Sequence, residues 1–172
     1  MPKIIESVRE QLLATAKKQI ETNGYAKTTV RSVAAECGIA VGTVYNYFPS
    51  KDMLIATFVA EDWQACLRDA ENCGTADAEA YLRFICDTLK AFAARHAKLF
   101  SDPDAARTYA EVFSERHGQL RDRLADLIRP LCTEAEEQLL SAQFIAEALL
   151  TWTMAGIPFE RIYTVIRRTI GR

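Results

Sequence analysis

The sequence predicts an all-α fold, and three observations lead to that prediction. Apolar residues recur at helical spacing along most of the chain, capping residues mark the ends of the periodic segments, and strand-like alternation is absent. The 172 residues are 49% hydrophobic and 26% charged, the balance of a soluble globular protein. We expect two helical domains, one over residues 1–50 and one over residues 51–172.

The first domain is predicted to contain three helices. An amphipathic helix spans about residues 4–22 and stops at Asn23-Gly24, and two short helices at 29–37 and 41–47 flank Gly38. Helices this short need a packing partner, which the first helix supplies. Thr28 or Thr29 is expected to cap the second helix. The residues expected to be buried by the two short helices and their turn are Val33, Ala34, Cys37, Ile39, Val44 and Tyr47.

The charge distribution weakly separates this domain from the rest of the chain. Residues 1–51 hold seven Lys and Arg against four Glu, a net charge of +3, while the whole chain has −2 and the remainder therefore −5. A mildly basic module on an acidic body fits a small DNA-binding domain carried by a second domain with another task.

Residues 30–48 read as a helix-turn-helix, and the segment after its turn carries a more detailed pattern. The pattern is Gly42-Thr43-Val44-Tyr45-Asn46-Tyr47-Phe48-Pro49-Ser50-Lys51-Asp52-Met53-Leu54, preceded by Thr28-Thr29. It resembles the TetR family of bacterial transcriptional repressors over about the first 55 residues. The resemblance implies a homodimer whose two helix-turn-helix domains bind a palindromic operator.

The second helix of a helix-turn-helix places its N-terminal residues in the major groove. Val41, Gly42, Thr43, Tyr45 and Asn46 occupy those positions, and Lys51 is suited to hold a phosphate. By resemblance, Thr29, Thr43, Tyr47 and Lys51 match positions that grip phosphates, and Arg31, Val41, Gly42 and Tyr45 match positions that meet bases. Tyr47 equally fits a core aromatic residue. Ala40 departs from the family pattern, which often has Ser there, and removes a helix cap.

Residues 51–172 are predicted to form further helices, with Ser50 and Pro103 as start signals. The expected ranges are about 50–72, 77–94, a short piece at 96–101, 104–115, a segment from Leu120 bent or ended by Pro130, 134–155 and 159–170. The last two helices are apolar on more than one side, so one face can pack within the subunit and another against a second copy in a four-helix bundle. A central helix buried within the monomer is the alternative.

Five aromatic residues of the second domain are candidates for lining a ligand pocket: Trp63, Tyr81, Phe84, Phe113 and Trp152. The same residues fit an ordinary core. With a pocket, the protein is expected to be a homodimeric repressor released from its operator by an apolar or amphipathic effector. Without one, it is a DNA-bound interaction protein that recruits a protein partner. Repression or activation depends on the position of the operator.

No catalytic constellation, cofactor motif or metal-ligand spacing is present, so we expect no enzyme, no cofactor and no metal. His96 and His117 stand alone and are expected at the surface or at helix caps. Five cysteines without a C-x-x-C pair indicate reduced thiols, with a redox sensor as the lesser alternative. Neither a signal peptide nor a membrane span is evident, so a cytoplasmic location without membrane contact is expected.

Overall fold

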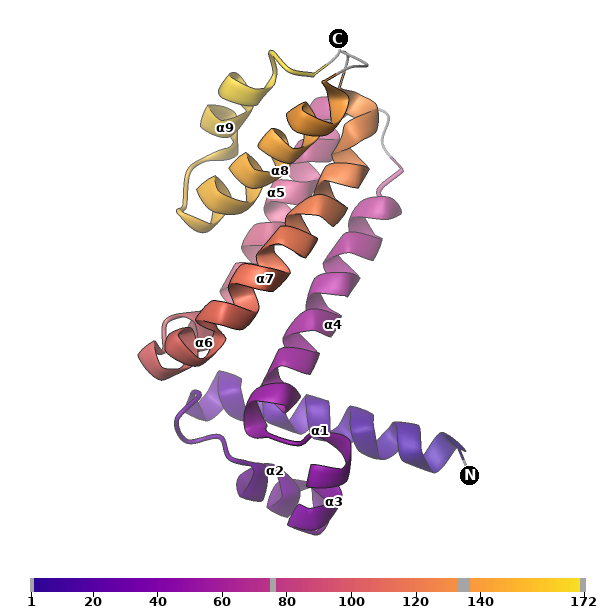
Figure 1. The fold of residues 1–172 in the computed structure, drawn as a ribbon, viewed down its shortest axis with the longest axis vertical. Helices are drawn as coiled ribbons and strands as arrows, with labels where there is room; N and C mark the ends of the chain where they lie inside the picture. Colours follow the sequence, from indigo (N-terminus) through magenta and orange to yellow (C-terminus); the bar gives the residue numbers. More distant parts are fainter. Residues whose placement is uncertain (1, 75–76, 133–136, 171–172) are drawn as a thin grey trace. The chain divides into compact units, whose positions relative to one another are not determined.

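The computed structural model describes residues 2–74, 77–132 and 137–170, and the side chains of 2–6 and 108–117 lie outside this description (Figure 1). Its helices are α1 (Pro2–Asn23), α2 (Val30–Cys37), α3 (Val41–Tyr47), α4 (Lys51–Glu71), α5 (Ala78–Arg95), α6 (Ala97–Phe100), α7 (Pro103–Ile128), the 3-10 turn η1 (Arg129–Leu131), α8 (Gln138–Met154) and α9 (Phe159–Ile166). Residues 1–63 with 95–110 form one compact unit, the head unit, and residues 64–94 with 111–172 form a second, the body unit. The predicted boundary between residues 50 and 51 remains a prediction.

The head unit contains the predicted three-helix module, in which α2 contacts both α1 and α3. Thr29 caps α2 by accepting a hydrogen bond from the backbone N–H of Ser32. Gly38 ends α2 with a left-handed φ of 68°, its N–H donates to Ala35 O, and the N–H of Ile39 donates to Ala34 O. This is a Schellman ending, which a glycine adopts without steric cost. Local chemistry therefore sets both ends of α2.

The core of the module is apolar and includes Val33 and Val44, each with no exposed surface, and Ala34 with 1%. These three burial predictions are confirmed. Cys37, Ile39 and Tyr47 are only half-buried, and the buried aromatic ring at the end of α3 is that of Phe48.

The predicted start signals of the later helices are also confirmed. Ser50 accepts a hydrogen bond from Met53 N at the start of α4. α7 begins at Pro103, and the Asp102 carboxylate accepts from the N–H groups of Asp104 and Ala105. A proline in the first turn loses no helical hydrogen bond, which explains this start.

The body unit is built from α5, most of α7, η1, α8, α9 and the end of α4. α8 contacts both α9 and η1. Its core is aliphatic with one large ring, and the largest fully buried side chains are Leu82, Leu124, Ile128, Ile145, Leu149, Phe159, Ile162 and Ile166. Cys132 and Ile170 form an isolated antiparallel bridge.

Two of the predicted helix ranges are wrong. The expected break between 104–115 and the segment from Leu120 does not occur, because α7 runs unbroken through Gly118 to Ile128, where the Pro130 turn ends it. The helix predicted over 159–170 ends at Ile166, and Ile170 instead pairs with Cys132. The start predicted at residue 134 lies outside the described residues.

Candidate nucleic-acid interface

Helix α3 contains five of the residues that sequence analysis assigned to base recognition. Gly42, Tyr45 and Asn46 are exposed, Tyr45 by 51%, while Val41 and Thr43 are half-buried. Val44, which lies between them, is fully buried and fixes the inner face of the helix. A short helix with one buried anchor and exposed polar groups can enter a major groove.

The start of α2 presents a second exposed edge, formed by Thr29 and Arg31. The Thr29 hydroxyl is the N-cap acceptor, and accepting a bond leaves the hydroxyl's own proton for donation to a phosphate oxygen. α3 lacks such a cap, because Ala40 has no side-chain hydrogen bond to offer. The amide-rich starts of both helices carry positive partial charge.

Lys51 has a more constrained position than its sequence assignment suggested. Its Nζ donates to the backbone oxygen of Tyr25 and lies 3.4 Å from the centre of the Tyr25 ring. The Tyr25 hydroxyl in turn donates to the Asp52 carboxylate at 2.7 Å. Burial lowers the pKa of the Lys51 ammonium, and nearby carboxylates oppose this. Lys51 therefore joins the start of α4 to the loop before α2, a role that sequence analysis missed.

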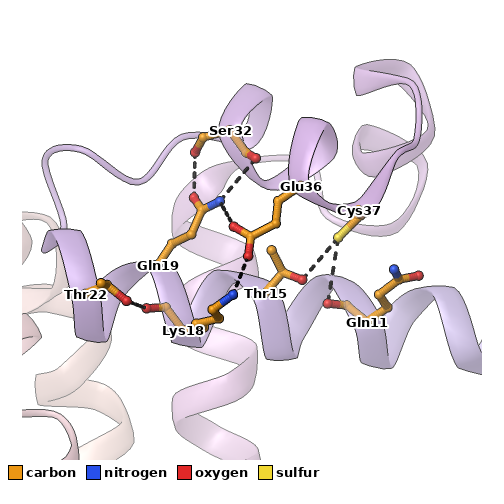
Figure 2. A network of polar contacts seen from close by, with 8 residues as sticks. All are labelled: Gln11, Thr15, Lys18, Gln19, Thr22, Ser32, Glu36 and Cys37. Carbon is orange, nitrogen blue, oxygen red and sulfur yellow. Dashed lines mark hydrogen bonds and ion pairs between the residues drawn. The ribbon is translucent and has the colours of Figure 1, made fainter.

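A polar network connects α1 to α2 (Figure 2). The Gln19 amide nitrogen donates to Ser32 O at 3.1 Å and to the Glu36 carboxylate at 2.7 Å, while its oxygen accepts from the Ser32 hydroxyl at 2.6 Å. The second carboxylate oxygen of Glu36 accepts from Lys18 Nζ at 2.8 Å. The hydrogen bonds from Lys18 and Gln19 lower the pKa of Glu36. Cys37, the last residue of α2, also contacts α1, with its Sγ 3.2 Å from Thr15 Oγ1.

This network was not predicted, although two signals existed in the sequence. Ser32 stands three residues after Thr29, the spacing of a reciprocal capping box, and that box is present. Gln19 falls on the apolar face of α1 between Ala16 and Ile20, where a polar residue needs a partner.

His96 is the N-cap residue of α6, in agreement with one of the two expected placements, although its side chain makes no capping hydrogen bond. Its side chain is buried, with Nε2 3.0 Å from Asp62 Oδ2 and its ring stacked on Phe58. Asp62 also pairs with Lys17 at 2.7 Å and approaches Arg95 at 3.7 Å. The apolar surroundings lower the pKa of His96, which outweighs the opposing effect of the Asp62 carboxylate. Sequence analysis did not predict this burial, because Asp62 on α4 and Lys17 on α1 lie far from His96 in sequence.

The five candidate ligand residues fall into different parts of the molecule. Trp63 is buried in the head unit, while Tyr81, Phe84 and Trp152 are half-buried in the body unit. The side chain of Phe113 lies outside the described residues, as does that of His117. The five cysteines, all within the described ranges, form no disulfide, and Cys66, Cys86 and Cys132 are buried as expected.

Comparison with known proteins identifies the family. Residues 12–57 match the family model of bacterial regulatory proteins, tetR family. Over 131 residues the chain is 30% identical to the HTH-type transcriptional repressor Rv1474c of Mycobacterium tuberculosis, covering 72% of this chain and 70% of that repressor. The chain belongs to the TetR family. It is also 28% identical over 158 residues to the HTH-type transcriptional repressor KstR of Rhodococcus jostii, covering 87% of this chain and 72% of KstR.

Solved structures agree on the fold. A TetR transcription regulator from Haloarcula marismortui covers 95% of both chains with a TM-score of 0.63 and 20% identity. As a TetR-family member, the chain is a DNA-binding transcriptional regulator and not an enzyme. Within the described residues, no three His, Cys, Asp or Glu side chains are placed to hold a metal ion. No helix in those ranges has the length and hydropathy to cross a membrane.

Proposed function

We propose that this TetR-family regulator is a homodimeric repressor that binds a palindromic operator through α2 and α3 and is released by a small-molecule effector. The observation that carries the dimer is the distribution of exposed apolar side chains. Seven large hydrophobic residues are exposed among those described, and five of them lie on α8 and α9: Leu139, Leu140, Phe144, Met154 and Val165. Such clustering on one pair of helices marks an interaction surface.

Three of these side chains share one face of α8. Leu140, Phe144 and Met154 lie four and ten residues apart, which places them on one face of the helix. The opposite face is buried in the body unit and includes Ile145 and Leu149, each with no exposed surface. A helix that is apolar on two faces needs two partners, and a second copy supplies the missing one in a two-fold arrangement.

The operator contacts divide into two classes. Thr29, Thr43, Tyr47 and Lys51 are proposed to contact phosphates, and Arg31, Val41, Gly42, Tyr45 and Asn46 to face bases. A dimer places its two α3 helices about 34 Å apart, one turn of the duplex, which requires a symmetric operator.

For effector release, α4 is proposed to be the connector. It contributes Lys51–Trp63 to the head unit and its remaining residues to the body unit. An apolar or amphipathic effector bound near Tyr81, Phe84 and Trp152 in the body unit would change operator affinity by shifting α4.

Footprinting the purified protein on DNA that flanks its coding region tests the operator, because two protected half-sites related by symmetry are expected. A single asymmetric footprint contradicts the dimeric mode. A thermal-shift screen of apolar compounds tests the effector, since a true effector raises the melting temperature and lowers operator affinity together. If no compound does both while a protein partner co-purifies, the body recruits that partner instead.

A further inference from the structure

We propose that Gln19 is a positioning residue for DNA recognition, which fixes the start of α2 on α1 so that the Thr29 hydroxyl meets a phosphate. The inference rests on the proposed phosphate contact of Thr29. Gln19 is only 7% exposed and sits among the apolar residues of α1. A buried amide is costly unless hydrogen-bonded, and a methionine of similar volume would fill the same space without that requirement.

The three hydrogen bonds of Gln19 explain why an amide stands there. Both amide protons are used, one on Ser32 O and one on Glu36, and the amide oxygen accepts from the Ser32 hydroxyl. The contacts lie at both ends of the short helix α2, at its third and seventh residues. Apolar packing of α2 on α1 is non-directional, whereas these bonds fix both the rotation and the axial position of α2.

The Ser32 hydroxyl passes this constraint to Thr29. Its oxygen accepts from the Thr29 N–H at 2.9 Å, while Thr29 Oγ1 accepts from the Ser32 N–H at 3.0 Å. The Ser32 proton has two acceptors in reach, Gln19 Oε1 at 2.6 Å and Thr29 O at 2.8 Å. Gln19 on α1 therefore positions Ser32, and Ser32 in turn positions the exposed Thr29 side chain through the capping box.

The experiment is a double-mutant cycle with Gln19→Met and Thr29→Val. The probe is the duplex that the wild-type protein selects from a random-sequence library. Its affinity is measured at several salt concentrations from about 50 to about 200 mM. Each single variant is expected to lower affinity about tenfold at every salt concentration and to leave the salt slope unchanged, because a neutral hydroxyl releases no counterion from the phosphate. Because both act on one phosphate contact, the double variant is expected to lose no more than either single variant.

Additive losses, or full affinity of Gln19→Met, would overturn the inference, as would full affinity of Thr29→Val. A wild-type protein that selects no duplex would instead refute the proposed function. Thr22→Val is the matched control, because its hydroxyl bonds only within α1, to Lys18 O, and affinity should be unchanged. Circular dichroism must show the same helix content for every variant used.

A charge exchange tests the same network if Gln19→Met does not fold. Gln19→Glu places a carboxylate 2.7 Å from the Glu36 carboxylate position and should lower operator affinity at neutral pH. Adding Glu36→Gln removes the like-charge contact and restores an amide–carboxylate bond with the roles reversed, so part of the affinity should return, although the carboxylate at position 19 cannot donate to Ser32 O. Full operator affinity of the Gln19→Glu single variant would overturn the inference.

Discussion

His96 Nε2 lies 3.0 Å from Asp62 Oδ2, and the imidazole ring is buried against Phe58. Lys17 and Arg95 are the cations that face the same carboxylate, at 2.7 and 3.7 Å. One side chain of α4 thus holds groups from α1, from the end of α5 and from the residue before α6, all within the head unit.

Protonation of His96 should destabilise the protein. Burial lowers the pKa of His96 in the folded state below its ordinary value near 6.5, so the unfolded chain binds a proton more readily. The contribution of His96 to stability is therefore complete above about pH 6.5 and is lost as the pH falls through the folded pKa. Melting temperatures of wild type and His96→Gln, recorded from pH 7.5 to 5, should diverge in slope on the acid side. Parallel curves would mean that His96 does not titrate with unfolding.

Removing the Asp62 carboxylate should lower the free energy of unfolding more than breaking an exposed ion pair of α4. Asp62 and Lys17 have side chains exposed by 18% and 29%, so Asp62→Asn leaves a partly desolvated ammonium without its carboxylate. We expect a loss of about 1–3 kcal/mol in the free energy of unfolding, measured with urea. Glu61→Gln is the neighbouring control, because its pair with Arg9 is more than 40% exposed on both sides and should contribute below about 1 kcal/mol. Equal losses would contradict this account.

The Lys51 ammonium contacts Tyr25 and is also proposed to contact a phosphate, and the salt dependence of binding tests the second role. Lys51→Met removes the ammonium group and with it the charge that would meet a phosphate. Binding should weaken on every DNA sequence, and the dependence of log affinity on log salt should flatten by about one unit. Lys90→Met, an exposed lysine on α5, should leave the slope unchanged. An unchanged slope for Lys51→Met would leave only its contact with Tyr25.

Local signals predicted the helix ends well, because capping acts between residues close in sequence. Thr29, Gly38, Ser50 and Pro103 each mark an end that the structure confirms. The break expected between residue 115 and Leu120 does not occur, although Gly118 lies there. A glycine in a helix interior costs only about 1 kcal/mol, which packing of the remaining α7 residues outweighs.

The polar contacts of the head unit could not be predicted in the same way. Lys17 and Asp62 are 45 residues apart, and Gln19 and Ser32 are 13 apart, so no local spacing indicates either pair. The residues proposed to face DNA were assigned from the helix-turn-helix pattern, whereas the residues that hold α2 on α1 could be identified only from the coordinates.

The exposed apolar surface of α8 predicts a change of oligomeric state. Phe144 is 48% exposed, and Phe144→Glu places a charge where the proposed dimer buries an aromatic ring. Sedimentation should show a dimer for wild type and a monomer for the variant, with weaker operator binding as a consequence. Met53→Glu is the control, because Met53 is equally exposed but lies on α4 in the head unit. A dimeric Phe144→Glu protein would exclude this face as the interface.

The Tyr45 hydroxyl is expected to contribute to sequence discrimination and not to general affinity. Tyr45 is 51% exposed on α3, next to Val44, whose burial prevents the helix from turning that side chain inward. Tyr45→Phe keeps the ring and removes one hydrogen-bonding group, so affinity for the selected duplex should fall about tenfold while affinity for random-sequence DNA stays constant. Competition binding with both duplexes at one salt concentration measures the ratio directly. If both affinities fall equally, the hydroxyl contacts a phosphate, since backbone contacts are the same on every sequence. If neither changes, only the ring of Tyr45 contributes to binding, and discrimination must come from Arg31, Val41 or Asn46.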